Sequence, residues 1–267
     1  MTAGALDSTP PALAVATAVA PLVNPVFIAD LHLAPNKPAT LARFARFMQE
    51  DAPRYAELVI LGDLFEFWVG DDTAAQAAPV IALLAAAAQQ RGQRVLLMHG
   101  NRDPLLGRDF ERATGGVLLA DPIVVDVTGT PTLLAHGDAW CTLDVAYQQF
   151  RVMARNPDWQ RAVLAKSIEE RIAMARGARA ESESAKSMKA MDIMDVTPEV
   201  VEAAMLAAGV TRLIHGHTHR PAAHEFRRDG RKFERWVLPD WEFEDGEVRG
   251  GYLDFEAGAP RLILFND

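Results

Sequence analysis

The chain has 267 residues, a net charge of −9 and a pI near 5.3, and 49% of its residues are hydrophobic. This length and composition suffice for a substantial buried core, either one large domain or a core with an insertion. The acidic balance argues against nucleic acid as a partner, because affinity for a phosphate backbone needs a basic face. The single cysteine, Cys141, excludes an intramolecular disulfide and a cysteine-based zinc site. It favours a reducing cytosolic setting, with Cys141 as a small buried apolar residue.

Residues 1–24 are rich in Ala, Val, Pro and Thr and have no basic segment at their start. Prolines at positions 10, 11 and 21 interrupt the apolar stretch, so it predicts neither a signal peptide nor a membrane span. We expect a disordered or loosely packed N-terminal extension. Elsewhere no uninterrupted apolar run reaches the roughly 18 residues of a spanning helix, which predicts a soluble or peripheral protein.

Strands and helices alternate in the first part of the chain. Short apolar strands are expected at 26–29, 57–61 and 94–98, with helices at 40–50, where Thr40 is the expected N-cap, and at about 75–90. This alternation predicts a mostly parallel sheet whose carboxyl edge collects the loops.

The second half of the chain changes in texture. Segments 122–127 and 132–135 indicate a β-hairpin, and the tail from 224 to 265 is rich in strand formers, with turns at Asp229-Gly230 and Asp245-Gly246. A second sheet is therefore expected to pack on the first. Between these segments, residues 143–208 are predicted to be helical.

Polar motifs follow the apolar runs. The run 210–214 ends in His215-Gly-His-Thr-His219, and imidazoles in such number suit divalent transition metals, although hydrogen-bonded histidines at a strand end would give the same pattern. Other histidines also follow apolar runs beside Asp or Asn. The candidate ligands are Asp30, His32, Asp63, Asn101, His136, His217 and His219. They are too many for one transition metal and fit two, with Asp63 shared. Such a pair activates water and stabilises the attacking and leaving oxygens in phosphate hydrolysis.

In this order, the motifs Asp-x-His, Gly-Asp, Gly-Asn-Arg-Asp, His-Gly-Asp and Gly-His-Thr-His resemble those of the calcineurin-like metallophosphoesterases. The resemblance implies an α/β (α+β) fold, a four-layer β-sandwich flanked by helices. It also implies two metal sites, one held by Asp30, His32, Asp63 and His219, and the other by Asp63, Asn101, His136 and His217.

Longer matches resemble the branch of this family that acts in lipid A biosynthesis; they lie at 27–33, at 60–65 with Trp68 and Gly70-Asp71-Asp72, and at 99–103, 193–196 and 214–221. That resemblance implies hydrolysis of the pyrophosphate bond of a UDP-linked diacylated glucosamine lipid, assisted by two Mn²⁺, with water attacking the α-phosphorus. It implies a cytoplasmic enzyme that is peripheral on the anionic cytoplasmic face of the inner membrane. The implied domains are a core of 25–142 and 197–267 and a helical cap of 143–196.

One departure concerns Arg102. Many family members that cleave phosphomonoesters carry His or Glu after Gly-Asn, where a histidine can protonate the leaving group. Arginine cannot act as an acid at neutral pH, but it binds phosphate oxygens bidentately. This choice suits a leaving group that departs as a stable phosphate, as from a pyrophosphate.

The resemblance implies catalytic roles for Asp63, Asn101, Arg102 and His217, and substrate contacts by Asn101, Arg102, Asp144, Tyr147, Ser182, Lys186, Lys189 and His217. Related sequences often have Asn at position 186 and Lys at position 183, where this chain has Lys186 and Glu183.

Segment 151–189 has nine Lys or Arg against five Asp or Glu, which indicates either a membrane-facing cap or a solvated helical face. Two other functions remain open, a phosphodiesterase or pyrophosphatase acting on a soluble nucleotide and a non-catalytic scaffold; the complete ligand set argues against the scaffold. No obligate protein partner is predicted.

Overall fold

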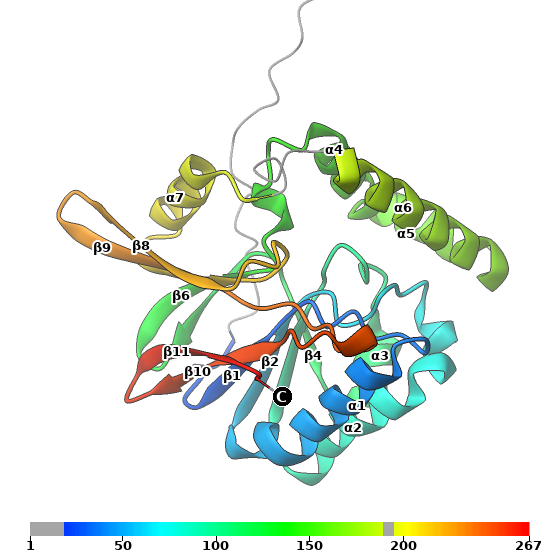
Figure 1. Ribbon diagram of the computed structural model, residues 1–267, viewed down its shortest axis with the longest axis horizontal. Coiled ribbons are helices and arrows are strands. Elements are labelled where there is room, and N and C mark those ends of the chain that lie inside the picture. Colours follow the sequence, from blue (N-terminus) through cyan, green and yellow to red (C-terminus); the bar gives the residue numbers. More distant parts are fainter. Residues whose placement is uncertain (1–18, 189–194, 267) are drawn as a thin grey trace, which may run out of the picture.

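The computed structural model describes residues 19–188 and 195–266, without the side chains of residues 181–188. Within these residues, the strands form two sheets stacked face to face (Figure 1). The larger sheet contains β1 (Pro25–Ile28), β2 (Glu57–Leu61), β3 (Arg94–Met98), β4 (Val117–Leu119), β10 (Gly251–Glu256) and β11 (Ala259–Leu264), in the order β11-β10-β1-β2-β3-β4. The smaller sheet contains β5 (Ile123–Val127), β6 (Thr130–Ala135), β7 (Arg212–His215), β8 (Ala222–Arg228) and β9 (Arg231–Val237), in the order β5-β6-β7-β9-β8.

Helices cover the outer faces of both sheets. Those of the core are α1 (Pro38–Arg46, prolonged by a wider turn to Asp51), α2 (Ala78–Ala85, prolonged likewise to Gln90), α3 (Arg108–Thr114) and α7 (Pro198–Ala207). Figure 1 shows α1, α2 and α3 under the larger sheet and α7 beside the smaller one. The four layers confirm the expected sandwich flanked by helices.

The alternation of side chains along the strands explains the layers. In β1, Val26 and Ile28 join the apolar cluster that includes helical residues such as Phe44, whereas Phe27 joins the cluster between the sheets. A third cluster packs α7 on the smaller sheet, and it includes Cys141, which is buried as expected.

The parallel strands bring the polar motifs to one edge. Strands β1, β2 and β3 pair in parallel and in register, as do β6, β7 and β9 of the second sheet. Each motif follows the carboxyl end of one of these strands, so the loops of both sheets meet on the same side of the sandwich.

The N-terminal segment departs from expectation. Residues 1–18 of the expected loose extension lie outside the described residues. Leu22, by contrast, is fully buried, and its backbone N–H and C=O are hydrogen-bonded to Asp126 and Thr128. The backbone N–H groups of Val23 and Asn24 donate to the Glu57 carboxylate. The packed structure therefore begins before residue 24, because a single apolar side chain and a buried acid fix this segment to the sandwich.

Two further expectations are corrected. Thr40 is not the N-cap of α1, because Pro38 starts the helix one turn earlier and Thr40 is buried inside it, with its hydroxyl accepting a hydrogen bond from Phe243 N–H. The tail strands also divide between the sheets. Strands β8 and β9 extend the second sheet. Strand β10 joins the first sheet as the antiparallel neighbour of β1, and β11 pairs antiparallel with β10 at the edge.

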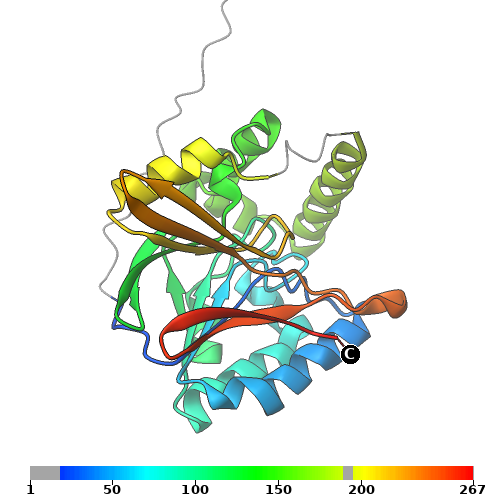
Figure 2. The ribbon, with the colours of Figure 1, turned by 60° about the vertical axis from the view of Figure 1, so that its left-hand side comes forward.

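Three helices lie between β6 and α7: α4 (Val145–Ala154), α5 (Pro157–Leu164) and α6 (Ile168–Met188). We call this segment the cap. Figures 1 and 2 show it standing apart from the helical layers, on the side of the sandwich where the strand-end loops gather. Among the described residues, none of the helices is long and apolar enough to cross a membrane.

Candidate metal centre

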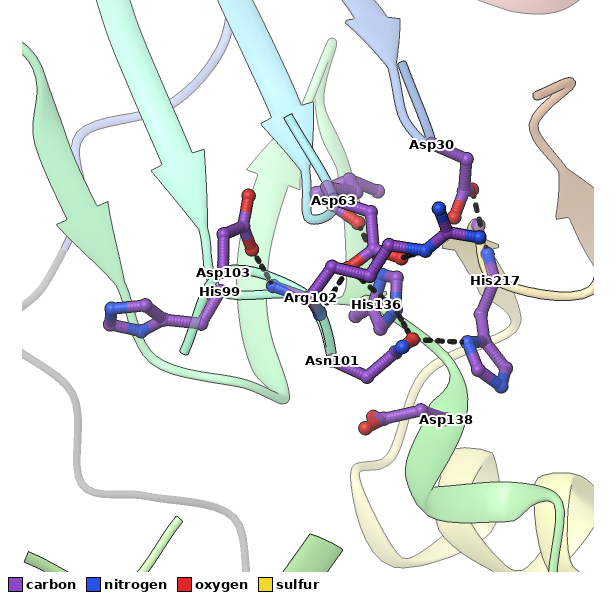
Figure 3. Close-up of polar contacts among 12 residues, drawn as sticks. Asp30, Asp63, His99, Asn101, Arg102, Asp103, His136, Asp138 and His217 are labelled. Atoms are coloured by element: carbon purple, nitrogen blue, oxygen red, sulfur yellow. Dashed lines mark hydrogen bonds and ion pairs between the residues drawn. The ribbon is translucent and has the colours of Figure 1, made fainter. Parts of the chain in front are cut away.

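The polar side chains that follow β1, β2, β3, β6 and β7 converge at the loop edge. Figure 3 shows Asp30, Asp63, Asn101, His136 and His217 directed toward a common centre. Four of the seven candidate ligands, Asp30, Asp63, His32 and His136, are almost completely buried. Five loops that are distant in sequence thus supply one compact group of oxygen and nitrogen atoms.

Asp63 lies between two groups of ligands. Its Oδ2 atom is 3.3 Å from Nε2 of His32, and its Oδ1 atom is 3.8 Å from Nε2 of His136. On the His32 side, Nε2 of His219 lies 3.6 Å from Oδ1 of Asp30. The two oxygens of Asp63 therefore face different imidazoles, as a shared carboxylate would.

The His136 side has its own arrangement. The Nδ1 atom of His136 lies 2.9 Å from the carbonyl oxygen of Leu61, so this nitrogen donates, and Nε2 is the nitrogen directed at the site and available to a metal when the ring is neutral. Nε2 of His136 is 3.1 Å from the amide oxygen of Asn101, and Nδ1 of His217 is 2.9 Å from the same oxygen (Figure 3).

The backbone at the centre is unusual. Five candidate ligands that are not glycine have positive φ angles, between 49° and 70°: Asp30, His32, Asp63, His217 and His219. Such conformations cost free energy and persist where the surroundings enforce them. Glycine makes the approach possible, because a Cβ at Gly100 would lie 2.0 Å from Oδ1 of Asp63, and one at Gly216 would lie 2.4 Å from Oδ2 of Asp30.

Charges at the centre are strongly coupled. Burial alone would lower the pKa of His136, but the surrounding carboxylates, first of all Asp63, raise it to about 9. Burial, helped by the positive charge of Arg102, lowers the pKa of His32 to about 3. Burial likewise lowers the pKa of His217 to about 4. The carboxylates thus create a field that favours a positive charge beside them, while two imidazoles stay neutral as metal ligation requires.

The donor set fits a divalent cation. Ligand atoms of Asp30, His32 and His219 lie within 4.8 Å of one another, and so do those of Asp30, Asp63 and His136. The buried Oδ1 atom of Asp30 has no hydrogen-bond partner among the described residues, so an acceptor is left for a cation to satisfy. Carboxylate, amide oxygen and imidazole together suit a metal of intermediate softness.

Arg102 lies against this centre. Its Nε atom is 3.4 Å from Oδ2 of Asp63, its backbone N–H donates to Oδ1 of Asp63, and its guanidinium also pairs with Glu66 at 2.5 Å. Arg102 thus lies beside Asp63, the candidate ligand between the two groups.

The cap residues named from the sequence have different environments. The Tyr147 hydroxyl donates to Asp138 at 2.5 Å, and the ring stacks on His217 with 5.7 Å between centroids. Asp144 caps α4 by accepting the backbone N–H of Tyr147. Ser182 and Lys186 belong to the part of α6 whose side chains are not described, and Lys189 lies outside the described residues.

Asp240 was missed by the sequence analysis. Its carboxylate lies 3.4 Å from Nδ1 of His219 and 3.1 Å from a guanidinium nitrogen of Arg249. It follows the end of β9, so the same rule that found the other acids at strand ends would have found it.

His99, by contrast, points away from the centre (Figure 3), with Nε2 at 2.8 Å from the Leu106 carbonyl oxygen.

The sequence matches the family described as calcineurin-like phosphoesterase over residues 24–221. The chain therefore belongs to this family, and the expectation of a hydrolase of this class is confirmed. Several similar proteins are named UDP-2,3-diacylglucosamine hydrolase. The one from Bordetella pertussis is 48% identical over 87% of this chain and 92% of its own length. Those from Ralstonia nicotianae and Cellvibrio japonicus are 45% and 44% identical, over 95% and 91% of this chain and 97% and 99% of their own lengths.

The contact between Asp240 and His219 generates a prediction. A carboxylate that accepts a hydrogen bond from the N–H of one imidazole nitrogen orients the other nitrogen for a metal. Asp240→Asn should therefore weaken divalent metal binding by about 10- to 100-fold, measured by calorimetric titration of metal-free protein. Glu247→Gln is the matched control, because Glu247 pairs with the same Arg249 at 3.0 Å and is 55% exposed. Equal affinities of the two variants would contradict the role of Asp240.

Proposed function

We propose that the protein hydrolyses the pyrophosphate bond of UDP-2,3-diacylglucosamine, giving UMP and 2,3-diacylglucosamine 1-phosphate in lipid A biosynthesis. The observation that carries the proposal is the near full-length identity of 44–48% to proteins named for this substrate, together with a complete set of motif residues at one edge of the fold. The mixed basic and apolar character of the cap favours a lipid-bearing substrate over a soluble nucleotide.

Two divalent ions are proposed for the centre, with Mn²⁺ as the expected metal. Asp30, His32, Asp63 and His219 would hold one ion, and Asp63, Asn101, His136 and His217 the other. The two faces of the Asp63 carboxylate, directed at His32 and at His136, support this division. When bound, such a pair lowers the pKa of water and neutralises charge on the phosphoryl oxygens.

The chain's own residues would then bind and orient the substrate. Arg102 offers a guanidinium beside the centre that can take two phosphate oxygens and spread the charge that develops on the leaving phosphate. Asn101 and His217, joined through the Asn101 amide oxygen, are placed to contact the phosphoryl group. Tyr147 stacks on His217 and closes this side of the site from the cap.

A substrate panel tests the proposed function. The purified protein with Mn²⁺ should hydrolyse UDP-2,3-diacylglucosamine far faster than UDP-glucose, ATP or p-nitrophenyl phosphate, because only the first matches both the diphosphate and the cap. Product analysis by mass spectrometry in ¹⁸O-labelled water should find the label in UMP, since water attacks the α-phosphorus. Faster turnover of a soluble nucleotide would favour the alternative, a nucleotide phosphodiesterase or pyrophosphatase, and no turnover of any substrate would favour a scaffold.

We also propose that the protein is peripheral on the cytoplasmic face of the inner membrane. Six of the twelve large apolar side chains that are exposed in the described part of the chain lie in the cap or directly before it: Leu143, Val145, Val152, Met153, Leu164 and Met174. The Lys and Arg side chains of the cap contribute less exposed positive charge than its composition suggested. Arg171 is buried against Asp72, and Arg155 donates to the carbonyl oxygens of His99 and Gly100. Apolar contact should therefore dominate over attraction to anionic lipids.

Vesicle sedimentation tests this location. Binding of the wild type to vesicles with anionic lipid should fall when Val152 and Leu164 are both replaced by Glu, because a charge on an apolar contact surface opposes insertion. Val248→Glu is the control, since Val248 is 48% exposed but lies outside the cap. Wild-type protein that never sediments with vesicles would contradict the proposal.

A further inference from the structure

Glu66 connects the cap to the candidate catalytic centre. It lies three residues after Asp63, in the loop that follows β2. Its Oε2 atom accepts from Arg102 at 2.5 Å, and its Oε1 atom accepts from Nε of Arg179 of α6 at 2.6 Å. The two oxygens of one carboxylate thus hold an arginine of the centre and an arginine of the cap.

Arg102 has few ionic partners other than Glu66. The side chain of Arg102 is only 7% exposed, and apart from Glu66 its recorded ionic partner is Asp63. The guanidinium of Arg102 thus lies between the carboxylates of Asp63 and Glu66. A partly buried, charge-assisted pair of this kind depends on both partners, because removal of one leaves a desolvated charge.

A second contact attaches α6 to the same loop. The Arg171 guanidinium, 3% exposed, donates to the Val69 carbonyl oxygen at 2.5 Å and pairs with the Asp72 carboxylate. Gly70 makes room for it, because a Cβ there would lie 2.4 Å from a guanidinium nitrogen. Arg171 and Arg179 are about two helical turns apart, so one side of α6 contacts the loop at both places. The segment 63–72 is therefore held by the candidate centre at one end and by α6 along its length.

We propose that Glu66 is a positioning residue for Arg102, and that α6 fixes Glu66 in this orientation through Arg179. The inference rests on the proposed function in one respect, that Arg102 contacts the substrate diphosphate. The side chain of Glu66 contacts Arg102 and Arg179, and its effect on the centre is proposed to pass through Arg102. Loss of Glu66 should leave Arg102 with Asp63 as its ionic partner. Loss of Arg179 should leave Glu66 without the contact that fixes its orientation toward Arg102.

A double-mutant cycle tests the proposal, with Glu66→Gln, Arg179→Gln and the double variant. Each single substitution should lower kcat by about tenfold, as for the loss of one coupled contact. The double variant should be no slower than Glu66→Gln, because Arg179 acts only through Glu66. Arg179→Lys should recover part of the activity. Multiplied losses, of about 100-fold, would overturn the proposal and indicate that Arg179 acts on the substrate directly.

Hydrogen–deuterium exchange gives a readout that needs no substrate. In Mn²⁺-loaded protein, Arg179→Gln should raise exchange in residues 99–106, which include Arg102. Metal content should equal that of the wild type. Arg112→Gln is the matched control, because Arg112 pairs with Asp109 on the exposed side of α3. If the wild type does not hydrolyse UDP-2,3-diacylglucosamine, the proposed function fails, whereas unchanged exchange in Arg179→Gln overturns the link between α6 and Arg102.

Discussion

The candidate centre depends on one buried carboxylate, that of Asp63. It is the only candidate ligand whose two oxygens approach imidazoles from different groups, His32 on one side and His136 on the other. It also accepts the backbone N–H of Arg102 and lies beside its guanidinium. Burial would raise its pKa, but the charges and hydrogen bonds of His136 and His32 hold the pKa well below the usual range. The surroundings of Asp63 therefore favour the ionised form of its carboxylate.

The fold surrounds the carboxylate of Asp63 with loops from both sheets. Parallel pairing places the ends of β1, β2 and β3 at one edge, and β6 and β7 add their loops from the second sheet. The strained backbone at Asp30, Asp63 and His217 turns the side chains inward, and Asp103 holds two of the loops together by accepting from the backbone of Gly100 and Leu64. The packing of the sandwich offsets the free-energy cost of these strained backbone conformations.

Much of this arrangement could be predicted from the sequence. The strands 57–61 and 94–98 have the bounds that their apolar runs indicated, and the polar motifs follow strands as expected. This success has a local cause, since a buried parallel strand is a continuous apolar run and its end is marked by Gly, Asp or His. The ordered set of motifs then identified the family, which no single histidine motif could do.

Other features depend on tertiary contacts that cannot be deduced from the sequence pattern. Leu22 is buried because a strand remote in sequence accepts it, and Thr40 lies inside α1 because Pro38 begins the helix. The excess of positive charge in the cap suggested a basic surface, yet Arg171 is buried against the core and Arg179 is paired with Glu66. Charge counts give the sign of a segment, but only tertiary contacts decide which charges face the solvent.

The most direct measurement of the central claim is a titration of metal-free protein with Mn²⁺, with free Mn²⁺ followed by electron paramagnetic resonance. Wild-type protein should take up two ions per chain. Asp63→Ala should bind both more weakly by more than ~100-fold, because the carboxylate shared by the two groups of ligands is lost. Retention of two ions at wild-type affinity by Asp63→Ala would contradict the claim that this carboxylate joins the two halves of the centre.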